Sequence, residues 1–187
     1  MQKILACLVL SVSCVLAQAA VHEKSIDASF PDELAGLTFV GRKEFPQKEL
    51  GVNLAYEQGL LRGSVFIYTA GLRSIPDGAD NDKVRKHFDQ VIGEVKQMET
   101  LGKVRAISFK DDRSQVTTLA GCGPQFLWRE YEMTLSEDLK LVSYTYLTGV
   151  RDHFVKLRIS HKNGAPHGKK DVDRFVSQLR KVIGKCP

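Results

Sequence analysis

Alternation of apolar and polar residues predicts a sheet in the second half of the chain. Residues 126–160 are predicted to form three consecutive antiparallel strands, separated by two short polar segments. In the last of these strands Val155, Leu157 and Ile159 alternate with polar residues, as expected when one face lies in the core and the other in water. Further strands are expected at 37–45, 52–57, 64–70, 103–110 and 114–120.

Two segments instead show the period of an amphipathic helix. The first has its apolar stripe within 84–98, begins near Asp80-Asn81-Asp82 and ends at Gly102. The second stripe lies within 172–183, with Gly184 just past its end. One long helix on each face of a mostly antiparallel sheet of about six to eight strands predicts an α+β fold, an α/β/α sandwich. The polar residues 21–29 are expected to form a loose lead-in, and 30–36 a turn or a single helical turn.

The first 20 residues have the pattern of a secretory signal peptide. A short basic start is followed by an apolar run too short to span a bilayer and then by the small-residue pattern Ala17-Gln18-Ala19. Cys14 and Cys7 offer a lipoprotein alternative, although more apolar chain follows Cys14 than such a signal has and Cys7 has almost no apolar region before it. Residues 21–187 have the length of one domain, which we expect to be periplasmic or secreted, with no later transmembrane segment.

Four cysteines occur in the chain, and two of them lie within the expected signal peptide. Cys122 and Cys186 remain, and in an oxidising compartment a lone pair most simply forms a disulfide. An alternative hypothesis makes Cys122, within Ala-Gly-Cys-Gly-Pro, the nucleophile of a small envelope enzyme.

The chain carries 27 Lys and Arg against 22 Asp and Glu, and much of the excess is local. Several cations gather between residues 151 and 170, and a solvated face is the simplest interpretation. The functional alternative is a surface that binds an anion or an acidic partner. Its candidate residues are Arg151, Lys156, Arg158, Lys162, Lys169 and Lys170. Nucleic acid is not an expected partner, because the exported chain has no recognisable binding motif.

The sequence patterns that suggest a metal site or a hydrolytic site are less specific. Asp77, Asp80, Asn81 and Asp82 lack the spacing of a calcium loop and fit a helix cap better. His153, His161 and His167 have no diagnostic metal-ligand spacing, so we expect no metal and no cofactor. Ser64 does not lie in a Gly-x-Ser-x-Gly motif, and Glu130 and Glu132 are expected to face solvent. Phe126 and Trp128 share the face of those acids, which predicts cover by the C-terminal helix or, alternatively, a cleft with an aromatic floor.

The order of these segments resembles the PsbP/Mog1 fold. The resemblance is carried by an exported chain that opens in Phe30-Pro31, by the strand 64–70 before the first helix and by the strand 153–160 before the last. It implies a noncatalytic accessory or partner-binding protein. The oxygen-evolving role of the plant members is not implied, because no photosystem-specific motif is present.

The sequence thus favours an exported noncatalytic accessory or binding protein of a bacterial-type envelope. The partner, a protein or a small ligand, is not indicated, and neither is the oligomeric state. The alternatives are an envelope enzyme that uses Cys122 or a histidine and an anion-binding surface protein that uses residues 151–170.

Overall fold

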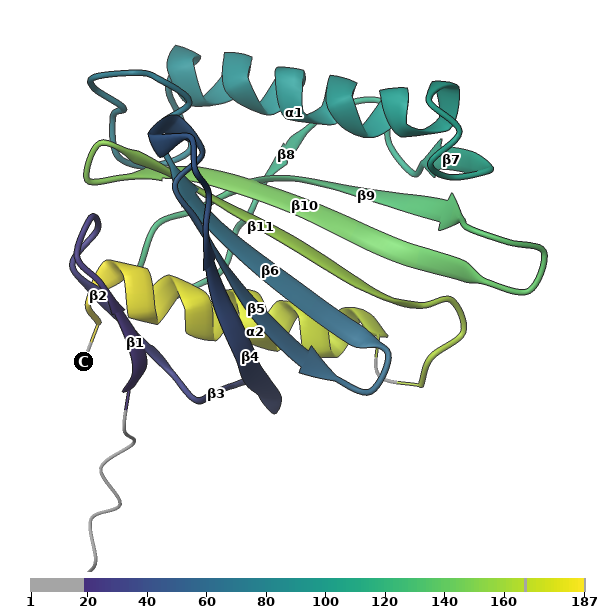
Figure 1. Cartoon of the computed structure of the whole chain (residues 1–187), viewed down its shortest axis with the longest axis horizontal. Coiled ribbons are helices and arrows are strands. Elements are labelled where there is room, and N and C mark those ends of the chain that lie inside the picture. Colours follow the sequence, from purple (N-terminus) through teal and green to yellow (C-terminus); the bar gives the residue numbers. More distant parts are fainter. Residues whose placement is uncertain (1–18, 167, 187) are drawn as a thin grey trace, which may run out of the picture.

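The computed structural model describes residues 19–166 and 168–186, and Figure 1 shows the order of its elements. More of the described residues lie in strands than in helices, and two helices lie against the large sheet. The strands are β1 (Ala19–Glu23), β2 (Ala28–Pro31), β3 (Glu33–Leu34), β4 (Leu37–Glu44), β5 (Val52–Gln58), β6 (Leu61–Tyr68), β7 (Ala106–Phe109), β8 (Gln115–Val116), β9 (Leu127–Thr134), β10 (Lys140–Val150) and β11 (His153–Lys162). The helices are α1 (Asp82–Thr100), α2 (Gly168–Gly184) and the short 3-10 turn η1 (Lys48–Leu50).

Nine strands form one sheet, in the order β3-β4-β5-β6-β11-β10-β9-β7, with β8 also paired to β9. All the pairs are antiparallel. Two meanders, β4-β5-β6 and β9-β10-β11, join where β6 pairs with β11. The pairing of β6 with β11 therefore brings together residues about ninety positions apart in the chain and places β11 near the centre of the sheet.

The two helices pack on opposite faces of this sheet (Figure 1). Val84, Phe88 and Ile92 of α1 lie in a cluster with Tyr68 and Phe154. On the other face, α2 buries Val172, Phe175, Val176, Leu179 and Ile183 in the largest cluster. Each such side chain contributes roughly 1.5–3 kcal/mol on burial, so packing rather than helix propensity holds both helices.

The N-terminus of α1 has the cap that the sequence predicts. Asn81 has extended backbone angles, and its side chain accepts a 2.9 Å hydrogen bond from the backbone N–H of Val84. This bond satisfies one of the free amides of the first turn. The carboxylate of Asp80 instead forms an ion pair with Arg85 at 2.6 Å.

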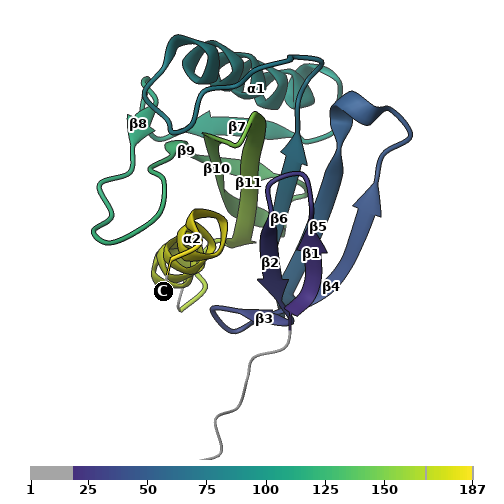
Figure 2. The same cartoon turned by 90° about the vertical axis from the view of Figure 1, so that its left-hand side faces the viewer.

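The α+β class, the antiparallel sheet and the two helices are confirmed, but the sandwich description holds only in part. The sheet has nine strands rather than six to eight, and it curves around α2, as Figure 2 shows. A separate two-stranded sheet, β1-β2, adds to the α2 side. No helix in the described part of the chain is long and apolar enough to cross a membrane.

The expectation of a loose lead-in at 21–29 is wrong. These residues lie largely in the hairpin β1-β2, whose Ile26 and Ala28 are buried together with Phe30. Glu23 is also buried, and it pairs with Arg42 of β4 at 2.5 Å. The ion pair and the apolar residues hold the hairpin against the rest of the molecule. Likewise residues 30–36 are not helical, since β2 and β3 run through them.

Candidate functional site

A hollow of about 250 Å³ lies between α1 and the sheet. Aromatic, aliphatic and charged side chains from three strands, the helix and the segment after it form its wall. They are Phe66, Val91, Glu94, Val95, Met98, Lys103, Thr145, Lys156 and Arg158. Two of the six predicted anion-binding residues, Lys156 and Arg158, thus lie together in one hollow.

The strand register explains why these two cations lie under α1. On β11, Phe154, Lys156 and Arg158 alternate with residues of the α2-side core, so they face the other helix. Lys156 pairs with Phe66 of β6, and Arg158 pairs with Thr145 of β10. The sequence pattern assigned this face to solvent, whereas the structure places it under α1 and leaves both cations half-buried.

The Lys156 ammonium lies over two aromatic rings. Its Nζ is 4.7 Å from the ring centre of Phe66 and 5.2 Å from that of Tyr68. Burial lowers the pKa of Lys156, Arg158 lowers it further, and Glu94 acts in the opposite direction. Lys156 is therefore held where its charged form is less stable than in water.

Within the described residues, the Arg158 guanidinium contacts only weak acceptors. Its Nη2 lies 3.4 Å from the sulfur of Met133 and 3.8 Å from that of Met98, and a thioether is a poor acceptor for a guanidinium. Among the described residues neither Arg158 nor Lys156 has a carboxylate within 4.0 Å. The hollow therefore contains two adjacent cations whose charge no anion of the described residues neutralises at contact distance.

A second pair of titratable groups lies next to Lys156. Tyr68 Oη and His87 Nε2 share a 2.8 Å hydrogen bond, and the His87 ring stacks on Phe154 at 4.1 Å. Burial lowers the pKa of His87, with Lys156 adding to the effect, and burial raises the pKa of Tyr68. Both groups are thus favoured in their neutral forms. The sequence analysis missed this pair, although His87 is three residues after Val84 and four before Val91, at the edge of the apolar stripe.

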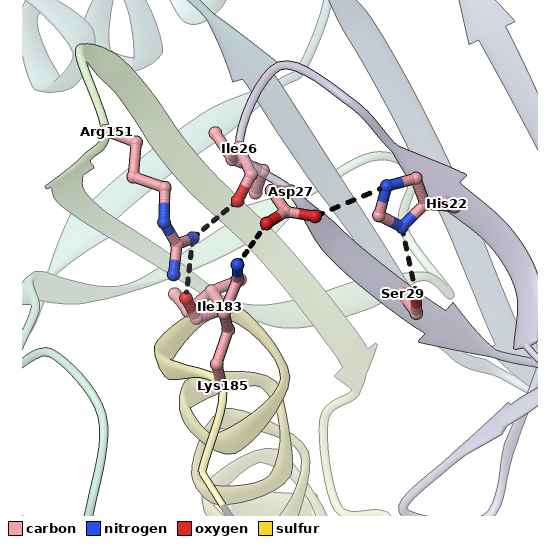
Figure 3. A network of polar contacts seen from close by, with 7 residues as sticks. All are labelled: His22, Ile26, Asp27, Ser29, Arg151, Ile183 and Lys185. Carbon is pink, nitrogen blue, oxygen red and sulfur yellow. Dashed lines mark hydrogen bonds and ion pairs between the residues drawn. The ribbon is translucent and has the colours of Figure 1, made fainter.

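Arg151 has a structural role at another end of the molecule (Figure 3). Its guanidinium donates to the carbonyl of Ile183, at the end of α2, at 3.1 Å, and also to that of Ile26. A cation at this position also faces the negative end of the helix dipole. Asp27 adds contacts to His22 and Lys185, so the network joins the β1-β2 hairpin to α2.

The remaining predicted cations lie elsewhere. Lys162 is exposed at the end of β11, and Lys170 is exposed on α2. Lys169 pairs with Asp173 and lies over the ring of Trp128, with its Nζ 5.2 Å from the ring centre. The structure therefore divides the six candidates among several places and brings only Lys156 and Arg158 together in a hollow.

Cys122 and Cys186 form the expected disulfide, with their Cα atoms 5.8 Å apart. The bond removes the free thiolate that a Cys122 nucleophile needs. The side chain of Arg180 fixes the same segment, because it donates four hydrogen bonds to the carbonyls of Ala120, Gly121, Gly123 and Pro124. A covalent bond and a buried guanidinium thus hold the segment before β9 against α2.

This segment also borders the aromatic face noted in the sequence. Phe126 is fully buried in the cluster that α2 covers, as the sequence favoured. Trp128 is only partly covered and, with Tyr146 and Lys169, lines a hollow of about 300 Å³. The C-terminal helix therefore covers Phe126, whereas Trp128 lies in the wall of a hollow.

The other histidines make local contacts. Nδ1 of His153 lies 2.8 Å from the carbonyl of Arg151, and Nδ1 of His161 lies 2.9 Å from that of Lys162. His167 lies outside the described residues. Within 19–166 and 168–186, no three His, Cys, Asp or Glu side chains are arranged to hold a metal ion.

The fold of this chain is similar to a solved structure. No protein-family model matches the chain, and no curated protein matches it. Among solved structures there is a match to the solution structure of a protein from Synechocystis sp. PCC 6803. The matched protein is cyanobacterial PsbP. The match covers 94% of this chain and 95% of PsbP, with 10% sequence identity and a TM-score of 0.47. PsbP is the family that the order of segments resembles. The sequence identity and the TM-score do not indicate what this chain binds.

Proposed function

We propose that this chain is an exported, noncatalytic binding protein of a bacterial-type envelope, and that the hollow beneath α1 holds a small amphipathic anion. One observation carries the proposal: Lys156 and Arg158 lie side by side, half-buried, with no carboxylate within 4.0 Å in the described chain. Burying a cation without a partner is costly, and a bound carboxylate or phosphate offsets that cost.

The charge of the lining favours an anion. Lys103, Lys156 and Arg158 are cationic and Glu94 is anionic, so three positive charges face one negative charge. Arg158 can offer two parallel N–H groups to a carboxylate or phosphate, and Lys156 a compact positive charge. Such charge-assisted hydrogen bonds are shorter and stronger than neutral ones.

The rest of the lining favours an apolar body on the ligand. Phe66, Val91, Val95 and Met98 present carbon and sulfur to the same space. At about 250 Å³ the hollow lies just below the usual range for small-molecule pockets, so it suits a short alkyl chain better than a long lipid. An alkyl carboxylate or alkyl phosphate meets both requirements.

Titration calorimetry with decanoate tests this assignment. We expect decanoate to bind and decanol, which has the same chain without the charge, to bind at least about tenfold more weakly. Lys156→Met and Arg158→Met should each weaken decanoate binding by about tenfold, because each removes one charge-assisted contact. Lys170→Met is the matched control, because Lys170 is an exposed cation on α2, and it should leave the affinity for decanoate unchanged. Equal binding of decanoate and decanol, or equal effects of all three variants, contradicts the assignment.

Export is the second part of the proposal. Residues 1–20 are proposed to be a signal peptide that is removed, and residues 21–187 to be a single periplasmic or secreted domain. Residues 1–18, Cys14 among them, lie outside the described residues. The Cys122–Cys186 disulfide supports an oxidising compartment.

N-terminal sequencing of the protein recovered from the periplasm or medium tests the removal of the signal peptide. It should give a chain that begins at or near Val21. A chain that retains Met1, or one that carries a lipid on Cys14, argues against this processing.

A further inference from the structure

Lys156 has an environment unlike that of an exposed lysine. Its side chain is half-buried beneath α1, and no carboxylate within 19–166 and 168–186 lies within 4.0 Å of it. A lysine that is desolvated and next to another cation becomes a better nucleophile, because the neutral amine carries the reactive lone pair. The hollow beside it leaves space for a small molecule to approach.

We propose that Lys156 is a nucleophile and captures small aldehydes that carry an anionic group, as reversible imines in this hollow. The inference rests on the proposed function, since it places a reaction in the same hollow. It narrows the ligand class to a carbonyl compound whose anionic group contacts Arg158 and whose apolar part contacts Val91 and Met98.

The reaction balances without an oxidant or a reductant. Neutral Lys156 adds its nitrogen lone pair to the carbonyl carbon, which forms a C–N bond and, after proton transfer from nitrogen to oxygen, a carbinolamine. Loss of water then breaks the C–O bond and leaves a C=N bond. The amine and the aldehyde thus give an imine and one water molecule, and hydrolysis reverses the step. Arg158 stays charged throughout, so it can hold the anionic group before and after the amine reacts.

The charged and titratable groups around Lys156 come from several elements. His87 and Glu94 are on α1, Tyr68 is on β6 and Arg158 is on β11, while Lys103 follows α1. Burial and Arg158 lower the pKa of Lys156, and Glu94 opposes them. His87 is itself favoured in the neutral form, so it adds no fixed positive or negative charge near neutral pH.

Reductive labelling with pyridoxal 5′-phosphate, an aldehyde that carries a phosphate, tests the inference. The full mature protein is incubated with this probe over a range of pH, the imine is reduced with borohydride, and each lysine is quantified by peptide mass spectrometry. Lys162 and Lys170, both exposed, serve as internal controls. We expect Lys156 to be labelled several-fold faster than both controls and to retain its labelling at lower pH. Decanoate should suppress the labelling of Lys156 alone.

Lys156→Arg separates this inference from the proposed function. Arginine keeps the positive charge but forms no such imine, so the variant should lose the fast label and still bind decanoate. Labelling of Lys156 no faster than that of Lys162 and Lys170, with decanoate binding intact, overturns the imine and leaves the anion site standing. If the wild-type protein shows neither fast labelling of Lys156 nor binding of decanoate, the imine and the anion site are both overturned.

Glu94→Gln removes the carboxylate that favours the ammonium form of Lys156, so it should speed the labelling of Lys156. Slower labelling in this variant contradicts the electrostatic argument.

Discussion

Replacing Arg180 with methionine should destabilise the protein far more than a surface substitution on the same helix. Arg180 is 1% exposed, and its guanidinium donates to four carbonyls of the segment 120–124 at 2.7–3.3 Å. Methionine fills a similar volume and offers no donor. The substitution therefore removes the hydrogen bonds while keeping most of the packing.

The magnitude follows from the four bonds and their surroundings. A hydrogen bond to a charged group contributes about 1.5–3 kcal/mol, so simple addition gives about 6–12 kcal/mol. Two terms reduce this sum. Residues 120–122 are exposed, so water can replace part of the lost bonding, and the variant avoids burying a guanidinium. We therefore expect a loss of about 3 kcal/mol in the free energy of unfolding.

Urea denaturation followed by far-UV circular dichroism measures this loss. Arg174→Met is the matched control, because Arg174 is exposed on the same helix and forms a surface ion pair with Asp171 at 3.3 Å. The control should cost less than about 1 kcal/mol. Equal losses for the two variants refute the view that Arg180 fixes the segment before β9.

The Cys122–Cys186 disulfide allows a second test of the role of Arg180 by urea denaturation. Its 64-residue separation corresponds to about 4 kcal/mol on the loop-entropy model. Since the disulfide and Arg180 hold the same segment, their effects should overlap. In a variant with Cys122→Ala and Cys186→Ala, the segment can leave α2 more easily, so Arg180→Met should cost clearly less than in the oxidised protein. Full additivity shows that the two are independent and contradicts this account.

Three further predictions concern other parts of the fold. Arg151→Met should lower the free energy of unfolding by about 2 kcal/mol, because it removes donors to two backbone carbonyls, and should leave decanoate binding unchanged in calorimetry. Gly149→Ala should cost about 3 kcal/mol in urea denaturation, since a Cβ there would lie 1.9 Å from the carbonyl oxygen of Pro76; an unchanged midpoint contradicts this. Burial lowers the folded-state pKa of His87 below 6.5, so protonation favours the unfolded chain and stability should fall as pH drops below about 6.5. His87→Gln should remove that part of the pH dependence, and an identical pH profile in the variant refutes it.

The central strands were predictable because their pattern is local. Val155, Leu157 and Ile159 are all buried on the α2 side, as their alternation indicated. The same pattern placed Lys156 and Arg158 on the opposite face. Their position beneath α1 depends on the pairing of β6 with β11, a contact between distant segments that no local pattern encodes.

The disulfide could be inferred from the two cysteines beyond the expected signal peptide, but the burial of Arg180 could not be inferred from residue type. Arginine on an amphipathic helix usually extends its charge to solvent. A positional signal was present, because Arg180 is four residues after Val176 and three before Ile183, on the apolar stripe. What the stripe does not show is the set of carbonyls that makes the burial of this charge tolerable.

The β1-β2 hairpin was missed because its composition is polar. Glu23 is 4% exposed, which a polar pattern does not suggest, and its burial depends on Arg42 from β4. The alternation of Ala28 with Phe30 is too short to distinguish a strand from a turn. Tertiary contacts, not local preference, thus decide the structure of this segment.

The most direct test of the proposed anion site is the position of bound decanoate by NMR. Intermolecular nuclear Overhauser effects between the alkyl chain and methyl-labelled protein report which side chains touch the ligand. We expect contacts to the methyl groups of Val91, Val95 and Met98. In Arg158→Met the same contacts should need about tenfold more decanoate. Contacts to Val116, Leu119 and Val176, which line the hollow beside Trp128, contradict it, as does the absence of any contact at saturating ligand.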